Sequence, residues 1–162
     1  MNRLTRFFIG AGFLAIGSFA LAQDEYDGAA YATCAACHLP DGAGIPGAFP
    51  PIRNRAAKIA ALEGGREYLV TVVTYGLMGT IEVDGAQYFG VMAGNAGPMS
   101  PAAIAAAINY VVFELNDDDA SDTKPFTAEE VESIQATITM KSPAGGGQLR
   151  TELTGKYGDE WP

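Results

Sequence analysis

Two cysteines and one histidine lie within a single short stretch, at Cys34, Cys37 and His38. They are the only cysteines and the only histidine of the 162-residue chain. If this stretch is helical, the two thiols share one face, because residues three apart are neighbours on a helix. Each thiol can then add to one vinyl group of the same porphyrin, and the imidazole that follows can reach the iron. The spacing therefore predicts covalent attachment of one c-type haem.

Three other uses of a Cys-x-x-Cys pair fit the chain less well. A thioredoxin-like redox motif needs a strand–helix–strand setting, and no strand pattern precedes Cys34. A structural zinc site needs four ligands, more than the two cysteines and one histidine present. A simple disulfide would leave His38 without a role. The haem interpretation uses all three side chains.

The first 22 residues have the pattern of a secretory signal peptide. Arg3 and Arg6 form a basic start, and the apolar run 7–22 ends in Ala-Leu-Ala. An uncleaved membrane anchor is the alternative, but this run is shorter than the roughly 20 residues that span a bilayer. We therefore expect cleavage after Ala22 and a periplasmic protein without a transmembrane span. Export agrees with the cysteine pair, because covalent haem attachment takes place outside the bacterial cytoplasm.

The charge balance is strongly acidic, with a formal net charge of −9. Without Arg3 and Arg6 the chain has 8 basic and 19 acidic side chains, a net charge of −11. This argues against binding to nucleic acid or to an anionic membrane surface. It favours steering toward a partner protein with a basic patch. The alternative is that the acidity only keeps an exported protein in solution.

The run from Cys34 to Ile52 resembles a class I (mitochondrial-like) cytochrome c domain of the bacterial kind. After Cys-Ala-Ala-Cys-His the chain continues through Gly-Ile-Pro-Gly-Ala-Phe-Pro-Pro-Ile. The resemblance implies that the Pro50 carbonyl accepts a hydrogen bond from His38 Nδ1, which fixes the ring and raises its basicity. It also implies that Ile52 packs on the haem.

Two residues near the motif depart from the family pattern. Leu39 replaces the glycine that often follows the histidine, and Tyr31 lies three rather than four residues before Cys34. Both aromatic spacings share one helix face, so the departure leaves the expected fold unchanged.

The fold that the resemblance implies is all-α, a small helical domain wrapped round one covalently attached haem. Its expected divisions are a signal peptide at 1–22, a cytochrome domain at 23–115, and an acidic loop with a C-terminal helical extension at 116–162. The extension is either a tail that packs on the surface or a docking segment for a partner.

Local patterns predict the individual elements. The expected helices are 24–37, 54–62, 66–75, one that starts at Pro101 after the N-cap Ser100, and one that starts after a capping box at 127–130. Asp84 and Gly85 predict the turn of a small hairpin within 79–88. We expect a flexible linker at 142–147, and Tyr110 is the candidate for the crossing of the first and last core helices, opposite Gly28.

The second iron ligand is expected to be a methionine, and Met92 and Met99 compete for the role. The tract Tyr-Phe-Gly-Val-Met at 88–92 resembles the family's Tyr-Asn-Gly-x-Met, whose methionine binds iron. Met99 precedes the N-cap, where an apolar residue packs against the first turns of the helix, here near Ile104. Met92 is therefore the predicted ligand. Arg53, Arg55 and Arg66 either contact the haem propionates or are solvated surface charges.

A haem with histidine and methionine ligands has no open iron position for a substrate, so the resemblance implies electron transfer rather than catalysis. We expect either a soluble periplasmic carrier or the cytochrome subunit of a periplasmic dehydrogenase. The donor would be a dehydrogenase or a quinol-oxidising complex, and the acceptor an oxidase or a reductase. The alternative is a haem gas sensor or a peroxidatic protein with an open or labile sixth ligand.

Overall fold

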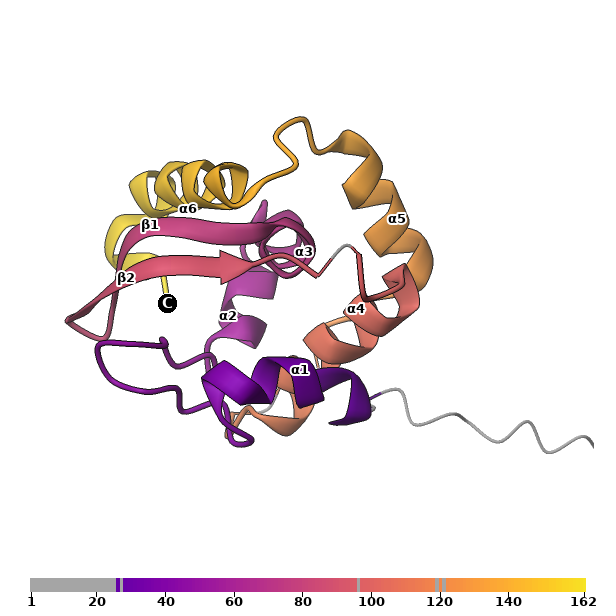
Figure 1. Cartoon of the computed structure of the whole chain (residues 1–162), viewed down its shortest axis with the longest axis horizontal. Helices are drawn as coiled ribbons and strands as arrows, with labels where there is room; N and C mark the ends of the chain where they lie inside the picture. The colour runs from indigo at the N-terminus through magenta and orange to yellow at the C-terminus, as the bar shows by residue number, and fades with distance from the viewer. Residues whose placement is uncertain (1–25, 27, 96, 119, 121) are drawn as a thin grey trace, which may run out of the picture.

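The computed structural model describes residues 26, 28–95, 97–118, 120 and 122–162. The described part is mostly helical, as predicted, with one two-stranded antiparallel hairpin (Figure 1). In chain order its elements are α1 (Gly28–His38), α2 (Ala56–Ala61), α3 (Gly65–Tyr75), β1 (Gly76–Val83), β2 (Ala86–Ala93), α4 (Pro101–Asn109), a π-helical turn (Tyr110–Glu114), α5 (Ala128–Thr137), α6 (Pro143–Tyr157) and a 3₁₀ turn (Gly158–Glu160). The predicted signal peptide at 1–22 lies outside the described residues.

Helices α1 and α4 cross through a pair of tyrosines. Tyr31 of α1 is buried, and its ring stacks on that of Tyr110 with the ring centroids 5.1 Å apart. A Cβ atom added to Gly28 would lie 3.1 Å from the Tyr110 ring. A larger residue at 28 would therefore push the helices apart, and the predicted crossing of Tyr110 opposite Gly28 is confirmed. Asp24, Glu25 and Asp27, which the sequence places at the start of this helix, lie outside the described residues.

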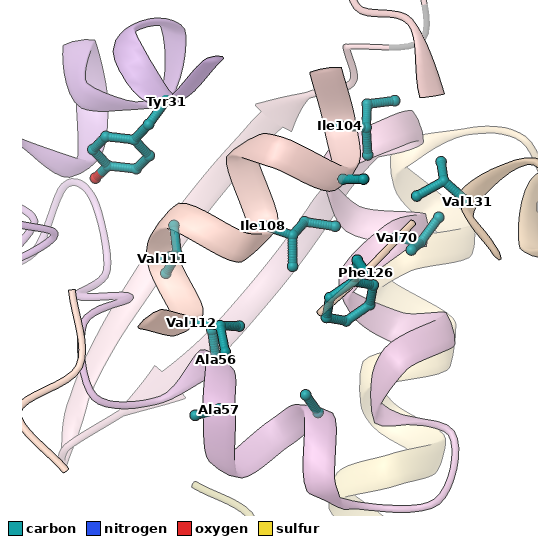
Figure 2. Close-up of a cluster of buried hydrophobic side chains, with 12 residues drawn as sticks. Tyr31, Ala56, Ala57, Val70, Ile104, Ile108, Val111, Val112, Phe126 and Val131 are labelled. Atoms are coloured by element: carbon teal, nitrogen blue, oxygen red, sulfur yellow. The ribbon is translucent and has the colours of Figure 1, made fainter. Parts of the chain in front are cut away.

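Helix α4 carries the centre of the hydrophobic core (Figure 2). Ser100 caps it as predicted, its hydroxyl oxygen accepting a hydrogen bond from the Ala103 N–H at 3.2 Å. Ile104 is completely buried, and so is Val112 in the π-helical turn that follows. Figure 2 shows these side chains facing residues of α2 and α3, together with Phe126 and Val131 from beyond residue 115. Part of the core is therefore supplied by the C-terminal extension.

The predicted hairpin is present and is longer than the sequence suggested. Strands β1 and β2 pair from Gly76 opposite Ala93 to Val83 opposite Ala86. The two turn residues Asp84 and Gly85 both have positive φ angles, of 53° and 76°. This is the conformation of a type I′ turn, whose twist matches that of the strands it joins. The pairing extends through Met92, which therefore lies in strand β2.

The prediction of a flexible linker at 142–147 is wrong, because this segment is the beginning of α6. A Cβ atom added to Gly146 would overlap the carbonyl oxygen of Gly76, and one added to Gly147 would overlap that of Met78. The glycines therefore let α6 lie directly on strand β1, as Figure 1 shows along the upper side of the hairpin. These glycines are explained by the close packing of α6 on β1. In the sequence alone, a run of glycines has the composition of a flexible linker.

Arg66 joins helix α3 to the extension. Its guanidinium donates two hydrogen bonds to the Glu130 carboxylate, both at 2.6 Å, and lies 3.7 Å from the centre of the Phe126 ring. Thr127 caps α5 as predicted by accepting a hydrogen bond from the Glu130 N–H. Arg66 is thus held in an ion pair with Glu130 and is not a solvated surface charge.

Candidate haem site

The cysteines and the histidine face a cavity between α1, the loop that follows it, and the hairpin. The open part of this cavity has a volume of 370 Å³. From α1 and the loop, its lining includes Cys34, Cys37, His38, Phe49 and Pro50. From the hairpin, it includes Leu77, Ile81, Tyr88, Val91 and Met92. The structure therefore brings the predicted attachment motif and the predicted methionine ligand to one cavity.

A second, inner cavity of 130 Å³ continues toward the core. The two cavities share six lining residues, which are Cys34, His38, Pro50, Leu77, Ile81 and Met92. The inner walls are mainly aliphatic and include Ile52, Leu69 and Val72. The combined space has the size of a typical small-molecule site, with apolar walls and a few polar groups.

His38 ends helix α1 in a buried position, with 7% of its surface exposed. Its Nδ1 lies 2.9 Å from the Pro50 carbonyl oxygen. A carbonyl can only accept, so Nδ1 carries the hydrogen and Nε2 keeps its lone pair for a metal. Burial lowers the pKa of His38, and the hydrogen bond to Pro50 partly opposes this. The ring is therefore held neutral and oriented, as a metal ligand requires.

The loop after α1 places the Pro50 carbonyl by a series of backbone hydrogen bonds. Gly44 donates to the His38 carbonyl at 2.9 Å, and Ile52 donates to the Gly42 carbonyl at 2.9 Å. A Cβ atom on Gly44, which has a φ of 67°, would overlap the Phe49 carbonyl oxygen. Glycine at 44 thus allows the loop to fold back on itself and to bring Pro50 beside the histidine.

The thiols of Cys34 and Cys37 are half-buried, and neither is part of a disulfide. Both line the open cavity, and Cys34 also lines the inner one. Burial raises the pKa of the Cys34 thiol. Both thiols are therefore presented to the cavity from one face of α1, as the helical spacing predicts.

The two candidate methionines lie in different surroundings. Met92 lines both cavities, and its strand position is opposite Leu77. Met99 packs against the core cluster around α4, which agrees with its expected contact at the start of that helix. Among the described residues that line the two cavities, Met92 is the only methionine.

The arginines fall into three groups relative to the cavity. Arg53 pairs with Asp117, and Arg66 with Glu130. Arg55 lines the inner cavity, but its guanidinium lies 2.7 Å from the Asp84 carboxylate. Arg150 of α6 also lines the inner cavity, and the sequence analysis missed it because residue 150 was assigned to an appended segment. Its place between the apolar Leu149 and Leu153 is the only signal that the sequence offers.

These residues fit a covalently bound haem. Two cysteines offer thioether bonds on one wall, a neutral imidazole offers Nε2, and Met92 offers a soft sulfur in the same cavity. In the described residues, no group of three or more His, Cys, Asp and Glu side chains is arranged to hold a metal ion by itself. Also within that part of the chain, no helix is long and apolar enough to cross a membrane.

Comparison with known proteins gives the same result as the geometry. No family model matches the chain. A cytochrome c-552 from Thermus thermophilus is 50% identical over 126 residues, covering 76% of this chain and 83% of the relative. A second cytochrome c-552 from the same species is 50% identical over 114 residues, covering 69% of this chain and 86% of that relative. The chain therefore belongs to the class I monohaem c-type cytochromes, the haem-based electron-transfer proteins that bind haem c covalently.

Proposed function

We propose that this cytochrome is a periplasmic one-electron carrier whose haem is held by thioether bonds to Cys34 and Cys37. His38 and Met92 would supply the two protein ligands to its iron. The observation that carries the proposal is the buried His38, oriented by the Pro50 carbonyl, in the same cavity as Met92. The bound haem supplies an iron that gains or loses one electron.

Two protein side chains would fill the two iron positions of the bound haem. The Pro50 carbonyl fixes the His38 ring and makes Nε2 a better donor. The ladder of β1 and β2 holds Met92 in place, since its backbone pairs with that of Leu77. A thioether ligand favours the reduced iron and raises the reduction potential. A site with two firm protein ligands passes electrons and leaves no position for a substrate.

An apolar shell keeps water away from the metal. Five aromatic and aliphatic residues each line one of the two cavities; they are Phe49, Ile52, Tyr68, Leu69 and Tyr88. Tyr68 and Tyr88 are buried, whereas Phe49 lies at the more exposed opening. A low dielectric around the iron limits the solvent reorganisation that accompanies electron transfer. Ile52 lines the inner cavity, in agreement with a packing contact on the haem.

A free carrier is favoured over a dedicated subunit of a dehydrogenase. The case for a subunit depended on the extension 116–162 as a docking segment. Phe126, Val131 and Leu153 of this segment are buried in the protein's own core clusters. Asp117 and Asp118 of the acidic loop pair with Arg53 and Lys58. The extension therefore packs on the protein itself through its apolar side chains, which favours the surface-packed segment over the docking segment.

The remaining negative charge supports brief encounters with basic partners. The net charge of the chain is −9, which steers association with a positively charged surface and weakens as salt is added. The proposed donor is a dehydrogenase or quinol-oxidising complex, and the proposed acceptor is an oxidase or reductase. Cleavage of the signal peptide after Ala22 would release the carrier into the periplasm.

The test is the optical spectrum of the purified ferric protein, recorded for wild type, Met92→Ala and Met99→Ala. We expect wild type to show the weak long-wavelength charge-transfer band from sulfur to iron. Met92→Ala should lose the band and become high-spin. Met99→Ala is the matched control, because it removes a methionine that packs in the core, and it should keep the band.

A wild-type spectrum with high-spin iron would contradict the proposal. The sixth position would then be open or labile, and the gas-sensor or peroxidatic alternative would replace electron transfer. Carbon monoxide distinguishes the two cases directly. It should not bind to the native reduced wild type within minutes, whereas it should bind rapidly to Met92→Ala.

A further inference from the structure

The β1–β2 hairpin exposes large apolar side chains on one of its two faces. Successive side chains of a strand point to opposite faces. Tyr88 of β2 is buried, whereas Phe89 and Val91 are 67% and 63% exposed. Met78 of β1 is opposite Val91 in the register and is 44% exposed. We call the surface formed by Met78, Phe89 and Val91 the apolar hairpin face.

Phe89 is an unexpected residue for a strand position in contact with water. The tract Tyr-Phe-Gly-Val-Met has phenylalanine where the similar family pattern has asparagine. Apolar surface in water is unfavourable, and its burial against another surface is favourable. A group of exposed apolar side chains on a soluble domain therefore marks an interaction surface.

The hairpin is also poor in charge. Residues 76–93 include two charged side chains, Glu82 and Asp84, and both lie next to the turn. The Asp84 carboxylate is already paired with Arg55 at 2.7 Å. Natural proteins commonly place charged residues on exposed strands to prevent association, and the remainder of this hairpin lacks them. The apolar hairpin face is thus a neutral region of a chain whose net charge is −9.

This distribution of charge favours one kind of occupant. A basic partner is drawn to the acidic surface and gains no ion pair at the apolar hairpin face. Two copies of the chain repel each other through their acidic surfaces, and the repulsion is smallest where neither copy brings a charge. A twofold contact needs a surface that is complementary to itself. Two apolar sheet faces meet this requirement, because sheets pack face to face through their side chains.

The apolar hairpin face adjoins the haem cavity. Phe89 and Val91 also line the open part of this cavity, next to Met92 in the same strand. Two copies in contact through their hairpins therefore have their cavities close together. An electron can then pass from a reduced copy to an oxidised copy. The same electron oxidises one copy and reduces the other, so the exchange needs no further reactant.

We infer that the apolar hairpin face is a contact surface for a second copy of this chain, across which the two copies exchange electrons. Three large apolar side chains form its centre, whereas a stable interface contains roughly 20–30 residues from each partner. The association is therefore weak and reversible. The electron exchange rests on the proposed function, but the contact between the copies does not.

The experiment is sedimentation equilibrium of the haem-loaded protein, from micromolar to millimolar concentration and at low and high salt. Phe89→Asn introduces the residue of the family pattern, and Met78→Gln removes a second apolar side chain of the face. Met140→Gln is the matched control, because Met140 is also 44% exposed but lies between α5 and α6. All three positions are exposed, so the variants should fold as wild type does.

Wild type should form a weak dimer that salt strengthens, because salt screens the repulsion between the two acidic copies. A contact between opposite charges would be weakened by salt instead. Phe89→Asn should raise the dissociation constant about tenfold or more, since both copies lose an apolar side chain from the centre of the contact. Met78→Gln should have a smaller effect in the same direction, and Met140→Gln should have none.

A second measurement connects the contact to electron transfer. In a mixture of the oxidised and reduced forms, the exchange rate is obtained from the broadening of nuclear magnetic resonance lines. Salt should accelerate the exchange in wild type, and Phe89→Asn should slow it by about the same factor by which it weakens the dimer. Equal exchange rates in Phe89→Asn and wild type would overturn the assignment of electron exchange to this face.

A protein that stays monomeric at millimolar concentration in high salt would overturn the inference. Weakening by Met140→Gln equal to that by Phe89→Asn would also overturn it, because the contact would then not be specific to the hairpin. A monomer that sediments with neutral phosphatidylcholine vesicles, except as Phe89→Asn, would assign the face to a lipid surface instead. A wild-type spectrum without the sulfur-to-iron band rejects the proposed Met92 ligand and leaves the sedimentation result unchanged.

Discussion

The residue after His38 shows how single positions support the site. Leu39 has a φ of 65°, a left-handed conformation that costs a residue with a side chain roughly 1–2 kcal/mol. Two hydrogen bonds hold its carbonyl, one from the Tyr31 hydroxyl at 2.7 Å and one from the Gly42 N–H at 3.1 Å. The two departures from the family pattern, at Tyr31 and Leu39, are therefore coupled. The Tyr31 hydroxyl stabilises the turn that Leu39 makes.

Tyr31→Phe tests this coupling. The variant keeps the ring stack on Tyr110 and removes the bond to the Leu39 carbonyl, so we expect a loss of about 1 kcal/mol in the free energy of unfolding. The measurement is equilibrium unfolding in urea. Tyr110→Phe is the control, because no hydrogen bond from its hydroxyl is found in the described part of the chain. Equal losses in the two variants would reject a role for the Tyr31 hydroxyl.

Helix α6 and the hairpin act together at the scale of elements. The hairpin carries Met92 on β2, and α6 lies on β1. The same helix supplies the buried Arg150 and Leu153. A strand that carries a proposed iron ligand needs support from its neighbour, and the close glycine contacts of α6 with β1 provide it. Two-stranded hairpins are only marginally stable alone, so this contact positions Met92.

Gly146→Ala should break this contact. Its Cβ atom would overlap the Gly76 carbonyl oxygen, and overpacking of this kind costs about 1–3 kcal/mol. Gly155→Ala in the same helix is the matched control, because nothing lies within 4 Å of its added Cβ. Alanine there should stabilise the helix by about 0.5–1 kcal/mol. Thermal unfolding measures both, and stabilisation by Gly146→Ala would show that α6 does not rest on the strand.

The whole molecule is more closely integrated than its sequence divisions suggest. Residues 116–162 contribute Phe126 and Val131 to the core around α4, and the bidentate pair of Arg66 and Glu130 joins them to α3. The longer of the two cytochrome c-552 matches covers 126 residues. Residues 1–115 are too few for a match of this length, so it includes part of the extension. The division at 115 remains a prediction about sequence, whereas the packing across it is continuous.

A double-mutant cycle on Arg66 and Glu130 measures this integration. Each single change to Gln should destabilise the protein, and the pair should show a coupling of about 1 kcal/mol or more, because both side chains are largely shielded from water. The exposed pair of Lys156 and Glu63 serves as the control and should show a smaller coupling. If the coupling energy between Arg66 and Glu130 is no larger than that of this surface pair, their ion pair does not stabilise the packing of the extension on α3.

The net charge gives a prediction for the whole surface. With small redox reagents in place of partners, oxidation of the reduced protein by a cationic cobalt(III) complex should slow as salt is added. Oxidation by anionic ferricyanide should accelerate. The reason is that an acidic surface attracts cations and repels anions until salt screens it. Stopped-flow absorbance of the haem measures both rates. Salt effects of the same sign for the two reagents would contradict electrostatic steering.

The sequence alone determined the chemistry, because that chemistry depends on local spacing. Cys34, Cys37 and His38 are on consecutive turns of one helix, and the loop that brings Pro50 to the histidine is short. Helix starts such as Ser100 and Thr127 are also local, since capping involves residues three apart. These features could be predicted because each depends on neighbours along the chain.

Only the tertiary structure decided which distant segments complete the site. Three successive glycines suggest a linker in sequence, but two of them, Gly146 and Gly147, allow helix α6 to approach strand β1 closely. Arg150 is an ordinary basic residue until α6 turns it toward Tyr68 and the cavity, 82 residues away in the chain. The two candidate methionines are distinguished by their surroundings. Met92 of the hairpin lines the cavity, whereas Met99 packs against the core around α4. Long-range burial decides such roles, and local sequence patterns carry little information about it.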